Sequence, residues 1–429
     1  MSTTERSLPT PAEFERQLVH FINVTLLGGN ATVDRDTRLF EDGYMNSLRI
    51  LDLIAVVEKT LGRRIPDRAV RLANFGTIGT IVNAFHPDAA AVTAAPPATS
   101  DRVFECRGDR ARFASPIDAM RARGDLAITS AGQVALSGLA LDVFDAVDHS
   151  VRGWARSLGA LEHRYPSMID VGVLERAGQL ESFPQHVTLA SHPVEDRPAV
   201  VPSGASAERT RRRGIAVVPT EGPLGRAAAL APAVCYHAYP EWEGKTIGPE
   251  PSLLTAVGRC YRYEDGNHVP LERLWEFTMR EIIVLGTRDQ VEGVRQSLVS
   301  QVSDLVTALA LDATIDVASD PFFAAGDEGR RLMQQAGALK HELQLAVDAT
   351  GRSIAAASFN HHHDFFGTRF DIRLADGTPA HSGCIAFGLE RWVLAILAQH
   401  GTNEREWPTA TRDWLTRARD ERVTSGARA

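Results

Sequence analysis

The sequence predicts a multidomain protein, in which a small N-terminal helical bundle precedes a larger α+β domain with an antiparallel or mixed sheet. Three observations support this prediction. The 429 residues are enough for two or three domains. The segment 86–102 is rich in Ala, Pro, Thr and Ser and lacks hydrophobic periodicity, which indicates a linker. Beyond it, strand-like runs lie between helical ones without a regular βαβ alternation.

Residues 10–87 are predicted to form the N-terminal domain, because their apolar side chains repeat at helical spacing. Gly62 is expected to end the second helix in a left-handed conformation. The linker is expected over 88–103. The expected elements of the bundle are a helix over 14–26, a helix over 47–62, a short piece at 67–72 and a helix over 77–85.

Residues 104–429 are predicted to form the α+β domain. The stretch 259–286 has aromatic and β-branched residues on both sides of a polar turn at 264–268, which is typical of two joined strands. Apolar residues at helical spacing predict helices over 292–311 and 327–345.

Composition and charge exclude several classes of protein. Lys and Arg total 46 against 54 Asp and Glu, and this net charge of −8 leaves no excess of cations for a nucleic-acid backbone. No apolar run approaches the ~20 residues of a membrane span, and the N-terminus does not resemble a signal peptide. The four dispersed cysteines fit reduced thiols. We therefore expect a cytoplasmic protein that binds neither membrane nor nucleic acid.

Ser47 stands directly before the second predicted helix. Taken alone it is an ordinary helix N-cap, because serine is strongly preferred there. The segment Leu39-Phe40-Glu41-Asp42-Gly43, followed by Asn46-Ser47-Leu48, resembles acyl and peptidyl carrier proteins, although Asn46 replaces the usual Asp. The resemblance implies a four-helix bundle in which a phosphopantetheinyl transferase attaches 4′-phosphopantetheine to Ser47.

Two groups of residues could bind a metal ion. Cys235, Glu281 and Cys384 carry the sulfur and carboxylate donors of zinc sites. Without a CxxC-type spacing, however, single cysteines are more often small buried hydrophobic residues. In the run His361-His362-His363-Asp364, neighbouring residues of an extended segment point to opposite faces, so they cannot all bind one ion. We favour a structural or substrate-lining role for that run.

Two further segments carry arginines and aromatic residues. They are Arg259-Cys260-Tyr261-Arg262-Tyr263-Glu264 and Arg273-Leu274-Trp275-Glu276-Phe277-Thr278-Met279-Arg280-Glu281. The planar fork of Arg262 can hold a phosphate, and Phe277 can stack on a base. Taken singly, Arg262 fits a surface ion pair equally well, and Phe277 fits a core position better than a binding site. Together with Gly388-Leu389-Glu390-Arg391 they form one set.

That set resembles motifs 2 and 3 of class II aminoacyl-tRNA synthetases. More closely, residues 160–429 resemble the amino acid:[carrier protein] ligases, which are truncated relatives of the atypical zinc-dependent seryl-tRNA synthetases. The other matching stretches are Ser182-Phe183-Pro184-Gln185, Cys235-Tyr236-His237-Ala238-Tyr239-Pro240, Asp320-Pro321-Phe322-Phe323, Ala338-Leu339-Lys340-His341-Glu342-Leu343, Ser358-Phe359-Asn360 and His381-Ser382-Gly383-Cys384.

The resemblance implies a role for each matching residue. Arg262 would contact the α-phosphate of ATP, and Glu264 the nucleotide or the amine side of the substrate. Phe277 and Arg391 would sandwich the adenine. The catalytic set is therefore Arg262, Glu264 and Arg391.

The resemblance also assigns the metal. Cys235, Glu281 and Cys384 fall where the family keeps its zinc ligands. In the histidine run, only His362 and Asp364 match the family pattern.

The predicted function is ATP-dependent activation of a small amino acid as its adenylate, with Mg²⁺, and transfer to a phosphopantetheine thiol. Glycine or alanine is the favoured substrate and serine a further candidate. The acceptor would be the chain's own N-terminal carrier domain, and the class II fold implies a homodimer. Two alternatives remain: an enzyme that charges tRNA, and an inactive paralogue that only presents a carrier.

Overall fold

The computed structural model describes residues 8–27, 32–39, 44, 49–63, 65, 72–87, 102–108, 115–190, 211–212, 215–216, 228–263, 267–318 and 339–426. Among these residues, no helix combines the length and apolar character needed to cross a bilayer.

The N-terminal helices follow the predicted apolar periodicity. In order they are α1 (Pro11–His20), the π-helix η1 (Phe21–Leu26), α2 (Arg49–Leu61), α3 (Leu72–Phe75) and α4 (Ile78–Phe85). Phe14, Leu18 and Ile22 are fully buried in the core of these helices. Gly62 has a φ of +64° directly after α2, so the left-handed helix end is confirmed. The expected piece at 67–72 lies outside the described residues except for Leu72, where α3 begins.

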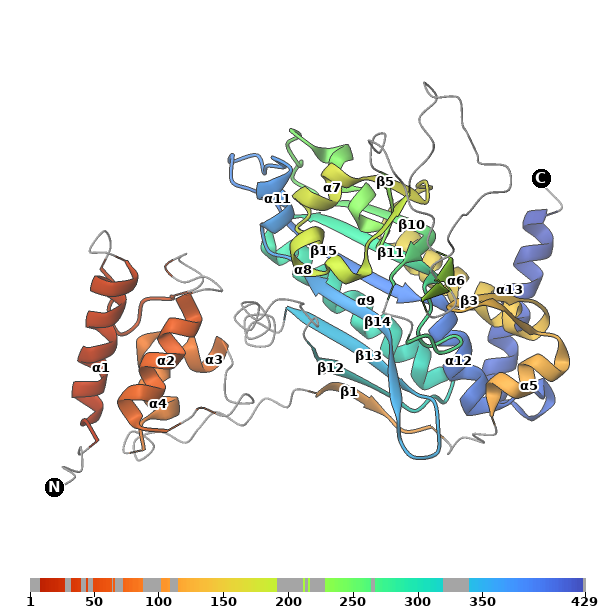
Figure 1. The fold of residues 1–429 in the computed structure, drawn as a ribbon, viewed down its shortest axis with the longest axis horizontal. Coiled ribbons are helices and arrows are strands. Elements are labelled where there is room, and N and C mark those ends of the chain that lie inside the picture. Colours follow the sequence, from red (N-terminus) through yellow and green to blue (C-terminus); the bar gives the residue numbers. More distant parts are fainter. Residues whose placement is uncertain are drawn as a thin grey trace.

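The larger part of the chain is built on an eight-stranded sheet (Figure 1). Every neighbouring pair is antiparallel except β10 and β4, which are parallel. Of the two predicted kinds, antiparallel or mixed, the sheet is therefore a mixed one in which antiparallel pairs dominate. Strand β1 begins at Arg102, inside the predicted linker. In spatial order the strands are β1 (Arg102–Cys106), β12 (Ala313–Val317), β13 (Lys340–Ala346), β14 (Ser353–His361), β15 (His381–Gly388), β11 (Glu276–Gly286), β10 (Ser252–Tyr261) and β4 (Leu161–His163).

The two faces of this sheet have different surroundings. On one face, Ile282 and Ile385 lie in a core shared with Leu298 and Trp392 of the covering helices. On the other face, Ile283 packs with buried residues of the loops and short helices. The long helices are α6 (Gly138–Ser157), α9 (Arg288–Ala308), α12 (Leu389–His400) and α13 (Thr409–Gly426).

Smaller elements complete this part of the chain. Strands β2 (Leu126–Ser130) and β3 (Gln133–Leu136) form a two-stranded sheet, and so do β7 (Arg211–Arg212) and β8 (Ile215–Ala216). A three-stranded sheet has the order β5 (Met168–Asp170), β9 (Ala228–Leu230) and β6 (Thr188–Ala190). The short helices are α5 (Pro116–Arg123), α7 (Val171–Arg176), α8 (Gln179–Ser182), η4 (Pro184–His186), η5 (Cys235–His237), η6 (Tyr239–Trp242), α11 (Phe365–Arg369) and η8 (Glu404–Glu406).

The helix prediction for 327–345 is wrong over its described end, where Lys340–Ala346 form β13. Leu343 and Leu345 are fully buried and alternate with partly exposed residues, which is the period of a strand. Lys, Glu, Leu and Gln are all good helix formers, so local propensity favoured a helix, and pairing with two neighbouring strands overrides it. The helix predicted over 292–311 is confirmed as α9, capped by Thr287.

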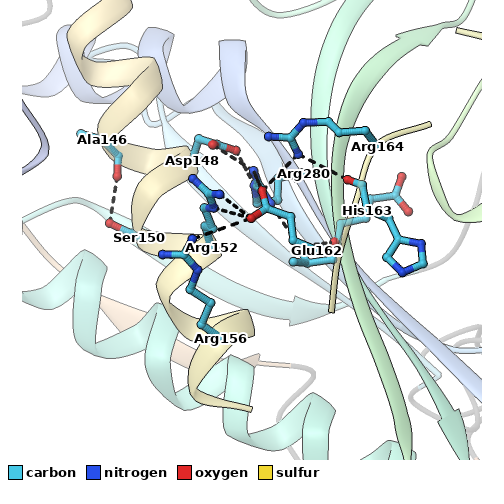
Figure 2. A network of polar contacts seen from close by, with 11 residues as sticks. Ala146, Asp148, Ser150, Arg152, Arg156, Glu162, His163, Arg164 and Arg280 are labelled. Carbon is cyan, nitrogen blue, oxygen red and sulfur yellow. Dashed lines mark hydrogen bonds and ion pairs between the residues drawn. The ribbon is translucent and has the colours of Figure 1, made fainter. Parts of the chain in front are cut away.

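A buried arginine joins α6 and the edge strand β4 to the sheet (Figure 2). Arg280 of β11 is only 1% exposed. Its guanidinium donates through Nε and Nη2 to the carboxylate of Asp148 and lies 3.6 Å from Glu162 Oε1. Arg152 and Arg164 bind the same Glu162 carboxylate.

Candidate metal and nucleotide site

Cys235, Glu281 and Cys384 come together on the face of the sheet away from the long helices. Cys235 begins η5, Glu281 lies on β11 and Cys384 on β15. Cys384 pairs directly with Ile283, so Glu281 is its diagonal neighbour on the same face. The candidate ligand atoms of the three residues all lie within 4.8 Å of one another.

The environment of this cluster fits a divalent cation. All three residues are buried, with Glu281 fully so. The Glu281 carboxylate accepts hydrogen bonds from Val234 N at 2.9 Å, Cys235 N at 3.1 Å and Cys384 Sγ at 2.8 Å. These donors are all neutral, and a buried carboxylate is costly unless a cation compensates its charge.

The raised pKa of a cysteine in the cluster also fits a bound cation. Hydrogen bonding to Cys235, together with burial and the charge of Glu281, raises the pKa of Cys384 well above its ordinary value. Such a thiol stays protonated on its own, whereas a bound Zn²⁺ would hold it as the thiolate. Two sulfurs and one carboxylate are zinc donors that leave one tetrahedral position open.

Arg262 and Phe277 lie beside this cluster. The Arg262 guanidinium stands 5.5 Å from the centre of the Phe277 ring, and its Nε donates to Pro232 O at 2.9 Å. Phe277 and Glu281 are four residues apart on β11 and therefore share one face, roughly 13–14 Å apart along the strand. The strand thus carries an aromatic ring near its start and the sulfur–carboxylate cluster at its middle.

Arg391 is held by backbone groups of two neighbouring segments. It lies in the first turn of α12, and its guanidinium donates to Glu272 O and Ala355 O, each at 2.8 Å. Its neighbour Glu390 is buried and accepts from Thr278 N at 2.9 Å. Burial raises the pKa of Glu390. The predicted adenine position between Phe277 and Arg391 stays a prediction.

Two predicted site residues, Ser47 and Glu264, lie outside the described residues. Their assigned roles remain those implied by resemblance.

The histidine run divides between the two faces of the sheet. His362 Nδ1 lies 3.3 Å from Ser382 Oγ and 3.5 Å from the Tyr239 hydroxyl, on the face of the sulfur–carboxylate cluster. His361 and His363 instead meet His381 of β15. The expectation that the run cannot converge on one ion is confirmed.

Sequence reasoning assigned no role to several residues that frame the cluster. Gln179 is 3% exposed and accepts a hydrogen bond from the Tyr236 hydroxyl at 2.8 Å. Asn360 donates to the backbone oxygen of Cys384 at 3.1 Å, which fixes the strand that carries this cysteine. Tyr236 and Asn360 both lie within the stretches that resemble the ligases, so this resemblance could have identified them.

Known proteins of two kinds, amino acid–[acyl-carrier-protein] ligases and serine–tRNA ligases, are similar to this chain in sequence. Residues 223–400 match the family model described as tRNA synthetase class II core domain (G, H, P, S and T). The chain is 33% identical to amino acid–[acyl-carrier-protein] ligase 1 of Bradyrhizobium diazoefficiens over 265 residues, which cover 61% of this chain and 78% of that protein. It is 26% identical to the type-2 serine–tRNA ligase of Methanothermobacter thermautotrophicus over 260 residues, which cover 59% and 50% of the two chains.

A solved structure shows the same fold. The structure of M. kandleri SerRS in complex with A. aeolicus tRNASec matches with a TM-score of 0.62 at 23% sequence identity. The match covers 79% of this chain and 67% of that chain.

Proposed function

This chain belongs to the amino acid–[acyl-carrier-protein] ligases, and from that premise we propose that it activates a small amino acid as its adenylate and loads its own N-terminal carrier domain. Membership of the family makes it a ligase. The proposal adds the substrate class, the metal, the phosphopantetheine arm on Ser47 and the carrier in the same chain.

The observation that carries the proposal is the shared face of Phe277 and Glu281 on β11, with Arg262 beside the ring. An amino acid bound by its amine at the sulfur–carboxylate cluster and an ATP bound by its base at Phe277 would meet between these two positions. Zinc bound by Cys235, Glu281 and Cys384 would supply one open coordination position for the neutral amine.

Activation follows as a displacement at phosphorus. The substrate carboxylate oxygen attacks the α-phosphorus of ATP, a new P–O bond forms, and the bond to pyrophosphate breaks. Arg262 neutralises charge that develops on the α-phosphate, because its fork can donate two hydrogen bonds to phosphate oxygens. The enzyme contributes positioning and electrostatics, without a covalent intermediate of its own.

Transfer then releases AMP. The phosphopantetheine thiol on Ser47, as thiolate, attacks the carbonyl carbon of the aminoacyl-adenylate. A thioester bond forms as the bond to the phosphate oxygen breaks. A tether raises the effective concentration of the thiol at the site. The segment 86–102 could span about 50 Å when extended at ~3.1 Å per residue.

Two alternatives give different results in assays. A tRNA-charging enzyme is favoured by the type-2 serine–tRNA ligases among the relatives and disfavoured by the net charge of −8. It would transfer the activated amino acid to tRNA. An inactive paralogue would not form an adenylate.

The metal and the adenylation step can be tested together by ATP–pyrophosphate exchange and zinc content. Cys384→Ala should lose the zinc of this cluster and the exchange activity, because it removes one of three protein donors. Cys260→Ala is the matched control, since Cys260 is equally buried, lies in the same core and is outside the cluster. It should keep both properties. Full exchange activity in a Cys384→Ala variant that has lost the zinc of this cluster would refute the zinc assignment.

A further inference from the structure

A second group of metal-binding side chains lies on the opposite face of the same sheet. His361 ends β14 and is paired with Gly383 of β15, while His381 begins β15. His363 follows two residues after His361 with a φ of +51°, a left-handed conformation uncommon for histidine. With this backbone conformation, the His363 ring lies next to the ring of His361.

The three imidazoles form a compact cluster. Their ring centres are 4.9 Å apart for His361 and His363, 5.5 Å for His361 and His381, and 5.8 Å for His363 and His381. One nitrogen from each ring lies within 4.8 Å of the other two. Nitrogens bound at about 2.0–2.1 Å to one tetrahedral ion lie roughly 3.3 Å apart. Small side-chain rotations would therefore bring the three onto a single ion.

Two ring nitrogens of this cluster make no hydrogen bond within the described ranges. His361 Nε2 and His381 Nδ1 are buried, and among the residues that the structure describes neither has a hydrogen-bond partner. Each buried nitrogen left without a partner costs about 1–3 kcal/mol. A metal ion bonded to the ring nitrogens would satisfy them.

The burial of the rings favours the protonation state that metal binding needs. Burial, with the neighbouring histidines, lowers the pKa of His361 to about 2, and burial lowers the pKa of His363 to about 4. Burial also lowers the pKa of His381. A lowered pKa favours the neutral imidazole, and a neutral imidazole is a metal ligand.

The charges around the cluster do not exclude a dication. Arg288 and Arg295 of α9 act on the cluster from the helix packed against it, and Asp364 and Asp289 act with the opposite sign. Arg295 is neutralised locally, because its Nη2 donates to Glu292 at 2.9 Å.

We infer that His361, His363 and His381 form a second metal site, which binds Zn²⁺ independently of Cys235, Glu281 and Cys384. Three imidazoles without a thiolate suit a borderline transition-metal dication. The bound ion joins the end of β14 to the start of β15. It thereby fixes the turn that presents His362 to the opposite face of the sheet.

The test is zinc stoichiometry of the full-length chain after metal removal and reloading with Zn²⁺ alone. The wild type should bind two equivalents, and His361→Ala one. His363→Gly should also bind one. This second variant should fold like the wild type, because glycine adopts the positive φ of position 363 without strain. His341→Ala is the matched control and should bind two equivalents. His341 has an unpartnered buried nitrogen on the same face but lies outside the cluster.

Cobalt distinguishes the two sites spectroscopically. With Co²⁺, Cys384→Ala should keep one equivalent without thiolate-to-cobalt charge-transfer bands, whereas His363→Gly should keep one equivalent with them. A His363→Gly variant that binds as many equivalents as the wild type would overturn the inference.

Discussion

The buried Arg280 should be the most sensitive electrostatic point of the large domain. Asp148→Asn removes the charge that its guanidinium binds through two nitrogens while keeping the side-chain shape. Breaking a buried ion pair by removing one partner costs ~3–5 kcal/mol. The Asp148 side chain is 23% exposed and Glu162 remains 3.6 Å from Arg280, so the lower end applies. We expect a loss of about 3 kcal/mol in the free energy of unfolding.

Urea unfolding followed by tryptophan fluorescence measures this change in free energy for the large domain. All six tryptophans lie between Trp154 and Trp414, so the signal does not come from the N-terminal helices. Asp145→Asn on the same helix is the control, because its partner Arg422 is 48% exposed and such pairs contribute ~0–1 kcal/mol. If Asp148→Asn costs no more than Asp145→Asn, the buried-charge argument fails.

Two further changes test the nucleotide site and the sheet packing. Arg262→Lys replaces the planar fork by a point charge and should lower ATP–pyrophosphate exchange about 10²-fold, with unchanged zinc content; undiminished exchange would remove Arg262 from the phosphate site. Gly383→Ala should destabilise the fold by about 1–3 kcal/mol, because its methyl group would lie 2.8 Å from Val291 Cγ1. Gly293→Ala on the packed helix α9 has no atom within 4 Å and should be neutral or stabilising in the same unfolding assay, and equal effects of the two changes would refute this packing argument.

Much of the fold could be predicted because its local patterns are strong. The apolar spacing of Phe14, Leu18 and Ile22 is that of a helix with one buried face, and these residues are buried. The aromatic and β-branched runs at 259–286 become β10 and β11. The segment 340–346 forms a strand in spite of its helix-forming residues, because they alternate in burial only once both neighbouring strands are in place.

The candidate site depended on contacts far apart in sequence. Cys235, Glu281 and Cys384 meet only through the register of β11 with β15 and the position of η5, which composition cannot supply. Resemblance to known families was needed to group them. The cluster of His361, His363 and His381 was missed, because it depends on the pairing of β14 with β15 and on one left-handed residue.

Intact-protein mass spectrometry would show whether the chain loads itself. The phosphopantetheinylated chain would be incubated with ATP, Mg²⁺ and a pool of small amino acids, with Ser47→Ala as the control. We predict one aminoacyl adduct on the wild type and none on Ser47→Ala, while both variants retain ATP–pyrophosphate exchange. Exchange without an adduct on the wild type would contradict self-loading and indicate a separate carrier or a tRNA as acceptor.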